Sequence, residues 1–214
     1  MNLSYEIDIK NAKKHTICIQ LHIDSPVKSG QIFWLPDWIP GSYLIRDFSK
    51  NITSIKAYSN NEPVQLIKID KSKWRLSQDV DCLNIEYAIY AWDLSVRSAH
   101  FDEQHCFFNG TSVFLAVDGY EFVKHQVTIS LTEHSKKNNW SIATSLPVIQ
   151  VDKAGFGSYE SENYTDLIDH PFEIAKLQTA DFVCHDTPHR MVFSEAPENI
   201  DLERIANDVQ AICD

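Results

Sequence analysis

The sequence predicts a mainly β protein, an antiparallel β-sandwich or saddle followed toward the carboxyl end by a few further strands and one helix. Two observations predict this class. Through the first two-thirds of the chain, apolar side chains recur at every second position in several runs, as they do in strands with one buried face. Turn residues separate these runs and no long helical pattern interrupts them, which favours antiparallel pairing.

Three runs show the alternation most clearly, at residues 17–23, 83–91 and 123–131. In each run the apolar positions carry mainly β-branched, aliphatic or aromatic side chains, which fit the pleated, half-buried surface of a strand. Residues 59–63, Ser-Asn-Asn-Glu-Pro, have the composition of a turn. We therefore expect neighbouring strands to be joined there.

The pattern changes near residue 150. Residues 153–158 have the composition of a loop, and residues 182–183 and 191–193 are expected to be short buried strands. Residues 199–213 predict a helix with Asn199 or Asp201 as N-cap, because four apolar residues at spacings of 3, 4 and 3 share one face. These residues are Leu202, Ile205, Val209 and Ile212. Unless that face packs back onto the sheet, we expect its partner to lie in a longer protein.

Composition and charge disfavour several classes of function. The 214 residues are 43% hydrophobic, enough to form a core, and carry a net charge of −11. An acidic chain has no field that attracts phosphates, so no nucleic-acid partner and no membrane partner is expected. No apolar run approaches the ~20 residues of a membrane helix, and the first residues do not resemble a signal peptide. Five widely spaced cysteines indicate reduced thiols, so a cytoplasmic location is expected.

Several catalytic motifs do not occur in the chain. No histidine is followed by glutamate, so the His-Glu-x-x-His motif, which places two zinc-binding imidazoles and a water-activating carboxylate on one helix, is absent. The Gly-x-Ser-x-Gly nucleophile motif and the phosphate-binding loop are absent as well. The sequence therefore predicts no catalytic residue, no metal site and no cofactor in this segment.

Two local groups of titratable residues could still serve a site. Cys184 and His185 precede His189, but Pro188 disfavours the helix that would align the two imidazoles, so structural histidines are the favoured interpretation. The second group lies at residues 100–105, where a solvated loop is favoured and a site-lining role is the alternative. Its titratable members are His100, Asp102, Glu103 and His105.

Two further stretches have an unusual composition. Residues 34–43 contain Trp34, Trp38, two prolines and a glycine, which fits either an aromatic binding platform or, as we favour, a corner that closes the end of a sandwich. In residues 107–114, Asn109 and the following glycine favour a tight turn with positive φ. Thr111 and Ser112 could then offer hydroxyls beside exposed amides to a peptide, although a plain hairpin between core strands is the favoured interpretation.

Five motifs in the same order resemble the amino-terminal region of the glycyl aminopeptidase family, zinc peptidases with a His-Glu-x-x-His motif and usually a PDZ domain. Residues 35–47 read Leu-Pro-Asp-Trp-Ile-Pro-Gly-Ser-Tyr-Leu-Ile-Arg-Asp. Residues 91–97 read Ala-Trp-Asp-Leu-Ser-Val-Arg, where Trp92 departs from the family's tyrosine. Residues 108–114, 167–174 and 188–190 match the remaining three motifs. The resemblance covers nearly the whole chain.

The resemblance implies a division into two parts. Residues 1–160 would form the β-rich amino-terminal domain, and residues 161–214 would begin a thermolysin-like α+β catalytic domain. The zinc ligands, the general base and a PDZ domain would follow Asp214, so zinc is expected in the parent enzyme and not in this segment. The missing catalytic domain and the peptide substrate would be its partners, and the segment alone should be inactive.

In related zinc aminopeptidases the amino-terminal β-domain helps to hold the free amino group of the substrate. By resemblance, we expect the segment from Arg97 to Ser112 to form that wall, with Asp102 or Glu103 facing the ammonium group. Asn109 and Thr111 belong to the same expected substrate-binding set. The parent enzyme would release small amino-terminal residues such as Gly or Ala.

Two interpretations from other classes remain open. A free-standing β-sandwich could bind peptide or carbohydrate through Trp34 and Trp38, and would bind its ligand as an isolated chain. A purely structural interaction domain would instead present the 199–213 helix to a partner. The coding sequence beyond residue 214 is the observation that separates them.

Overall fold

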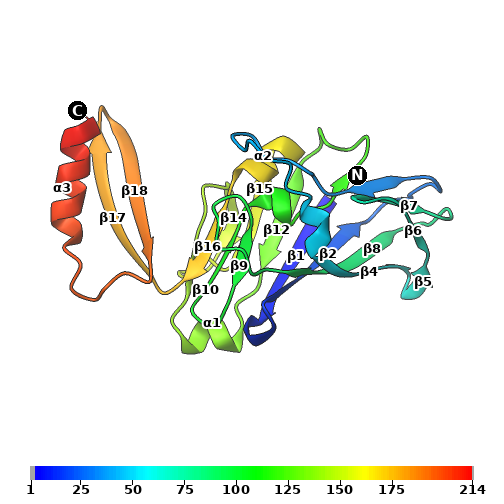
Figure 1. The fold of residues 1–214 in the computed structure, drawn as a ribbon, viewed down its shortest axis with the longest axis horizontal. Coiled ribbons are helices and arrows are strands. Elements are labelled where there is room, and N and C mark those ends of the chain that lie inside the picture. The colour runs from blue at the N-terminus through cyan, green and yellow to red at the C-terminus, as the bar shows by residue number, and fades with distance from the viewer. Residues whose placement is uncertain (1–2, 214) are drawn as a thin grey trace.

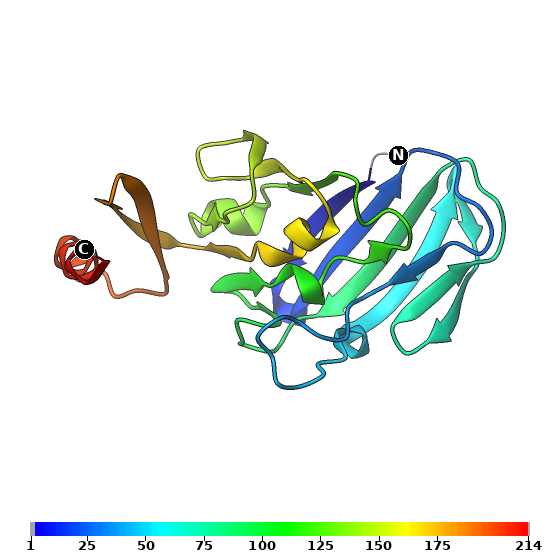
Figure 2. The same ribbon diagram turned by 90° about the horizontal axis from the view of Figure 1, so that it is seen from above.

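A computed structural model describes residues 3–213 and shows a β-rich body from which a hairpin and a helix project (Figures 1 and 2). The strands are β1 (Leu3–Asn11), β2 (Thr16–Ile23), β3 (Ile32–Trp34), β4 (Ile52–Ser59), β5 (Glu62–Val64), β6 (Leu66–Asp70), β7 (Lys73–Leu76), β8 (Leu83–Tyr90), β9 (Ala99–Phe101), β10 (His105–Phe108), β11 (Ala116–Val117), β12 (His125–Ile129), β13 (Ser141–Ala143), β14 (Val148–Val151), β15 (Gly157–Ser161), β16 (Phe172–Ala175), β17 (Leu177–Cys184) and β18 (Thr187–Ser194). The helices are α1 (Glu133–Lys137), α2 (Tyr164–Asp169) and α3 (Leu202–Cys213), with 3-10 turns η1 (Ala12–Lys14), η2 (Phe48–Asn51) and η3 (Gly110–Ser112). Within the described range, no helix has the length and apolar content needed to cross a membrane.

An eight-stranded sheet frames the body, in the order β14-β15-β12-β1-β2-β8-β4-β5. Its neighbours pair antiparallel except β1 and β12, which run parallel with Leu3 opposite His125 and Ile7 opposite Ile129. Two four-stranded sheets, β13-β16-β10-β9 and β11-β3-β7-β6, complete the body. The predicted mainly β, antiparallel architecture is confirmed, with this one parallel pair as the exception.

The apolar side chains at every second position of β2 and β8 form one face of each strand, and this face lies in the core. Burial alternates residue by residue along both strands, and Ile19, Leu21 and Ile85 are among the side chains with almost no exposed surface. Full burial of such a side chain contributes about 1.5–3 kcal/mol. The predicted runs at residues 17–23 and 83–91 are therefore strands with a buried face, and the third run contains β12.

Three buried tyrosines hold an irregular segment inside the core. Residues 113–115 are fully buried yet belong to no strand or helix. The hydroxyls of Tyr87, Tyr164 and Tyr5 donate to their three successive carbonyl oxygens at 2.9, 2.7 and 2.7 Å. Burial raises the pKa of all three hydroxyls, so they remain protonated donors. These bonds satisfy backbone groups that would otherwise be unpaired in the interior.

Two of the predicted turns are confirmed. Asn60 and Asn61, at φ of 49° and 67°, form the two-residue connection between β4 and β5, a conformation that asparagine tolerates well. At the predicted loop 153–158, the Asp152 carboxylate accepts the backbone N–H groups of Ala154 and Phe156 at 2.8 and 2.9 Å. The loop ends two residues earlier than predicted, because β15 begins at Gly157.

The last part of the described chain forms a separate hairpin and helix (Figure 1). The expected short buried strands at 182–183 and 191–193 lie in β17 and β18, which have eight residues each and mostly exposed or half-exposed side chains. The expectation of burial is wrong, because a hollow of about 810 Å³ lies between the hairpin and the body. The packing of α3 against β17 covers only part of the hairpin. Asp201 caps α3, since its carboxylate accepts the N–H of Arg204 at 3.0 Å.

Candidate functional site

The segment predicted to line a site contains a β-hairpin. β9 and β10 pair antiparallel, with Phe101 opposite Cys106. Asp102 directs the turn, because its Oδ1 accepts the N–H groups of Gln104 and His105 at 2.7 and 2.9 Å. The solvated-loop interpretation of residues 100–105 holds for the turn at residues 102–104 and is wrong for the two histidines. The strands carry both of them inward and leave His100 only 7% and His105 only 6% exposed.

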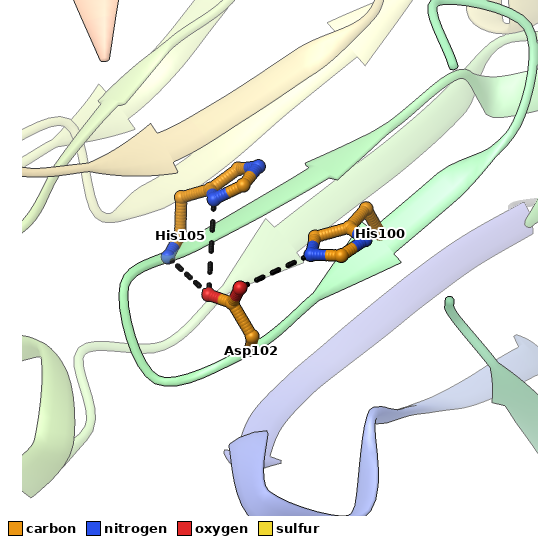
Figure 3. A group of neighbouring side chains, drawn as sticks. All are labelled: His100, Asp102 and His105. Atoms are coloured by element: carbon orange, nitrogen blue, oxygen red, sulfur yellow. Dashed lines mark hydrogen bonds and ion pairs between the residues drawn. The ribbon is translucent and has the colours of Figure 1, made fainter. Parts of the chain in front are cut away.

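Asp102 uses its carboxylate within the hairpin. His100 Nε2 lies 3.1 Å from Asp102 Oδ2 (Figure 3). Burial acts to raise the pKa of Asp102, but the N–H groups of His105 and Gln104 and the His100 side chain outweigh it, and the pKa is lowered. The group is therefore an ionised carboxylate whose oxygens already have donors.

The side chains of His100, Asp102 and His105 converge on one another (Figure 3). Their candidate ligand atoms all lie within 4.8 Å of each other, and the two imidazole rings stack with centroids 4.9 Å apart. Within residues 3–213, this is the group of three or more His, Cys, Asp or Glu side chains whose ligand atoms lie close enough together to hold a metal ion. Imidazole and carboxylate are ligands that zinc accepts.

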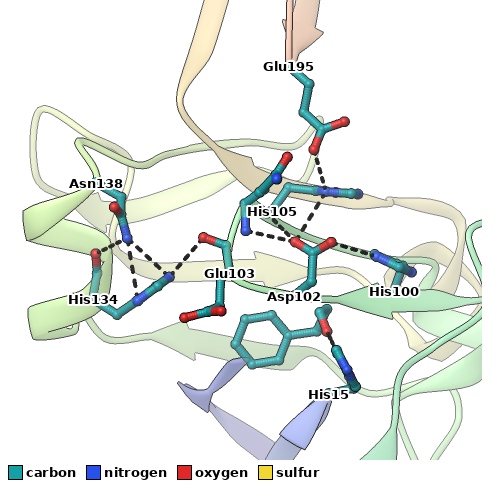
Figure 4. Close-up of polar contacts among 10 residues, drawn as sticks. His15, His100, Asp102, Glu103, His105, His134, Asn138 and Glu195 are labelled. Carbon is teal, nitrogen blue, oxygen red and sulfur yellow. Dashed lines mark hydrogen bonds and ion pairs between the residues drawn. The ribbon is translucent and has the colours of Figure 1, made fainter. Parts of the chain in front are cut away.

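Glu103 lies at the tip of the hairpin in different surroundings. Its side chain is 61% exposed, with Lys13 Nζ 3.8 Å away. Its backbone carbonyl lies 3.2 Å from Nε2 of His134 in α1, and the Asn138 side chain contacts the same imidazole (Figure 4). A hollow of about 450 Å³ beside the tip is lined by Lys13, His15, Asp102, Glu103 and Gln104. The contact with His134 thus places an exposed carboxylate beside an open hollow.

Asn109, Thr111 and Ser112 have internal partners in this structure. Asn109 Oδ1 accepts the backbone N–H and the hydroxyl of Thr111, at 3.1 and 2.6 Å. The expected exposed hydroxyls are wrong, because Thr111 and Ser112 are 1% and 2% exposed. The expected tight turn is also wrong: Asn109 has φ of −88° and caps η3. Gly110 serves close packing instead, since a Cβ there would lie 2.9 Å from the Cα of Ile168. Substrate binding by these residues stays a prediction.

Arg97 lies before β9 and away from the hairpin tip, where its guanidinium donates to the carbonyl of Gly41 at 3.5 Å. This contact joins the loop before β9 to the aromatic stretch at residues 34–43. The corner interpretation of that stretch is supported by burial, and the binding-platform interpretation stays a prediction. Leu35 and Ile39 are buried and close a corner of the body, whereas Trp38 and Tyr43 are exposed on its outside.

The two tryptophans of the predicted binding platform lie in different environments. Trp34 packs edge-on against Tyr164, with ring centroids 5.7 Å apart. Trp38 Nε1–H donates to the carbonyl of Ser42 at 2.8 Å. At the other predicted group, Pro188 lies in β18 and His185 in the hairpin turn, so the helix needed to align His185 with His189 does not form, as predicted.

Sequence reasoning missed the burial of the two hairpin histidines. A signal was present, because Ala99 and Phe101 before the turn, and Cys106 and Phe108 after it, alternate as strand residues do. The three polar residues 102–104 concealed it, since a short polar run between apolar residues also fits a solvated loop.

Comparisons with known proteins agree on the family and the fold. A family model described as the peptidase M61 N-terminal domain matches residues 4–176. The crystal structure of an aminopeptidase N family protein from Idiomarina loihiensis superposes with a TM-score of 0.92 and 36% identity, over 99% of this chain and 35% of that one. Aminopeptidase A from Legionella pneumophila, in complex with aspartic acid, superposes with a TM-score of 0.52 and 12% identity, over 91% of this chain and 23% of that one. At that identity the second match shows the fold alone. No curated protein matches the chain.

Proposed function

The chain belongs to the peptidase M61 family, and on that premise we propose that it is the substrate-positioning part of a zinc-dependent aminopeptidase. The proposed reaction releases small amino-terminal residues, Gly or Ala, from peptides in the cytoplasm. The chain spans about a third of the length of the Idiomarina protein. We assign the chemical step to a catalytic domain that begins within residues 161–214 and continues beyond them, followed by a PDZ domain.

The catalytic zinc of this proposed enzyme does not fit the residues present. A hydrolytic zinc needs a water-activating carboxylate and an open coordination position beside the substrate. The chain has no His-Glu-x-x-His motif, and within residues 3–213 both histidines of the candidate metal group, His100 and His105, are buried in a hairpin. We therefore derive only what this chain's own residues would do, which is to bind and orient the substrate.

The exposed Glu103 carboxylate on its fixed hairpin tip is the observation that carries the proposal. Of the two acidic residues expected to face the substrate ammonium, Asp102 is engaged by backbone N–H groups and by His100. Glu103 has only the distant Lys13 ammonium near its carboxylate. A charge-assisted bond from Glu103 to the free amino group would select peptide ends. We propose that Glu103 makes this contact and that Asp102 shapes the hairpin that presents it.

The complete protein, assayed on Gly- and Ala-peptide substrates, tests the proposal. We expect chelator-sensitive release of the first residue, no turnover by residues 1–214 alone, and about a tenfold or larger loss of kcat/KM in Glu103→Ala. Asp102→Ala should lower kcat/KM together with stability, because the turn loses its acceptor. The matched control is Glu133→Ala, whose carboxylate in α1 is 92% exposed. Unchanged kcat/KM in Glu103→Ala would refute the assignment to Glu103, and unchanged kcat/KM in both Glu103→Ala and Asp102→Ala would refute a role for this hairpin.

A further inference from the structure

Four titratable side chains, those of His100, Asp102, His105 and Glu195, gather where the β9–β10 hairpin approaches the end of β18 (Figure 4). His105 Nδ1 lies 3.7 Å from Asp102 Oδ1 and 3.5 Å from Glu195 Oε1. His100 Nε2 lies 3.1 Å from Asp102 Oδ2. Glu173, on β16 beside β10, is near enough to His105 and Glu195 to interact electrostatically with both. Two buried imidazoles thus lie close to three carboxyl groups, of which Glu195 is half exposed.

No hydrogen bond satisfies the buried Nδ1 atom of His105, although the two carboxylate oxygens lie just beyond bonding range at 3.5 and 3.7 Å. A tetrahedral zinc ion with bonds of about 2.0–2.1 Å holds its ligand atoms about 3.3 Å apart. The nitrogen–oxygen spacings of 3.1, 3.5 and 3.7 Å lie near that value, whereas the candidate ligand atoms as a group lie within 4.8 Å of one another. An ion placed among these atoms would engage Nδ1 if the side chains closed around it.

The cluster also has ligand types that suit a cation. Two imidazoles offer nitrogen atoms, and Asp102 and Glu195 offer carboxylate oxygens within 3.1–3.7 Å of them, and zinc accepts both kinds of ligand.

We propose that His100, Asp102 and His105, with Glu195 as the fourth ligand, bind a divalent metal ion of the zinc class. Three ligands come from the hairpin of the body, and Glu195 follows β18 in the projecting unit (Figure 4). The ion would therefore fasten the β17–β18 hairpin and α3 to the body. This site concerns metal binding by residues 3–213 and does not rest on the proposed peptidase activity.

Metal titration of the 214-residue chain, made without a histidine tag and stripped with chelator, tests the site. With Zn²⁺ in calorimetry we expect one ion per chain, and with Co²⁺ the visible absorption of a four-coordinate ion. His100→Gln and His105→Gln should each weaken binding at least about 100-fold, and Glu195→Gln about tenfold. The control is His170→Gln, which removes a histidine that faces Asp166 at 3.3 Å on α2 and should leave binding unchanged.

Several results would overturn the site. Absence of saturable Zn²⁺ uptake and of the Co²⁺ band in the wild-type chain would show that the cluster holds no metal ion. Uptake that survives His105→Gln, or that His170→Gln removes equally, would place the ion elsewhere. Because the wild-type Co²⁺ spectrum is decisive by itself, a variant that fails to fold does not leave the question open.

Discussion

Asp102 and Glu103 are adjacent residues with the same functional group, yet their surroundings give them different chemistry. Asp102 lies inside the turn, where backbone N–H groups and His100 hold its carboxylate ionised. Glu103 projects from the turn, and only its backbone is held, through His134. Asp102 therefore shapes the hairpin and could ligate only an ion held within the histidine cluster, whereas the exposed Glu103 carboxylate can bind a cation that arrives from solvent.

His125 gives the fold a defined response to pH. The imidazole is fully buried beside Tyr5 and Tyr164. Desolvation lowers its pKa from 6.5 to about 4, only partly offset by the backbone of Val123. The unfolded chain thus takes up this proton at a higher pH than the folded chain. The neutral His125 imidazole therefore does not penalise folding above about pH 6.5. As the pH falls from there toward 4, the free energy of unfolding decreases by up to about 3 kcal/mol.

We predict that His125→Phe removes this part of the pH dependence, because phenylalanine keeps the ring contacts and cannot be protonated. Urea unfolding at several pH values between 7 and 4 gives the free energy of unfolding as a function of pH. The effect of His125 is the difference between the variant and the wild type in how steeply this free energy falls with pH. The control is His185→Asn, which replaces an exposed histidine in the turn between β17 and β18 and should leave the pH dependence as in the wild type. A variant whose stability falls with pH as steeply as that of the wild type would contradict the assignment to His125.

At the scale of elements, the segment from η3 to β11 shows how an irregular chain can pass through a core. Asn109 caps η3, Gly110 lets α2 approach, and the tyrosine hydroxyls satisfy the carbonyls of residues 113–115. These requirements account for an Asn-Gly pair without a tight turn. They also explain why Thr111 and Ser112 are buried here and not displayed to solvent.

Tyr164→Phe tests this element. The change keeps the ring that packs against Trp34 but leaves the buried carbonyl of Phe114 without its donor, so we expect a loss of about 1–2 kcal/mol in the free energy of unfolding. The control Tyr90→Phe alters a residue that is 43% exposed and should change stability by less than about 0.5 kcal/mol. Equal effects of the two changes, measured by urea denaturation, would show that the hydroxyl does not support the segment.

How far the sequence predicts the structure depends on the range of the interaction concerned. The strands β2 and β8, the turn at Asn60 and the cap of α3 follow from local pattern and were predicted. The pairing of β1 with β12 joins residues more than a hundred positions apart, and no local pattern encodes it. The residues of the histidine cluster are a candidate group in the sequence, but the burial of His100 and His105 is not predicted there, because it depends on what packs over the hairpin. Glu195 reaches the cluster from just beyond β18, far along the chain.

At the scale of the whole molecule, the chain is a broad β-body with a loosely attached carboxyl-terminal unit (Figure 2). The family match ends at residue 176, one residue before β17 begins. The hairpin tip with Glu103, the histidine cluster and the contact with Glu195 all lie on the side of the body that this unit approaches (Figure 4). We infer that the body presents this edge to the remainder of the proposed enzyme, with the substrate's amino end between them.

The discrimination between free and blocked peptide ends tests the central claim most directly. In the complete protein, kcat/KM would be measured for an alanyl peptide and for its N-acetylated form, in the wild type, Glu103→Gln and the control Glu133→Gln. We predict that the wild type and the control strongly prefer the free amino group, and that Glu103→Gln reduces this preference about tenfold or more. A Glu103→Gln enzyme that keeps the full preference would contradict the claim that this domain recognises the substrate's amino end.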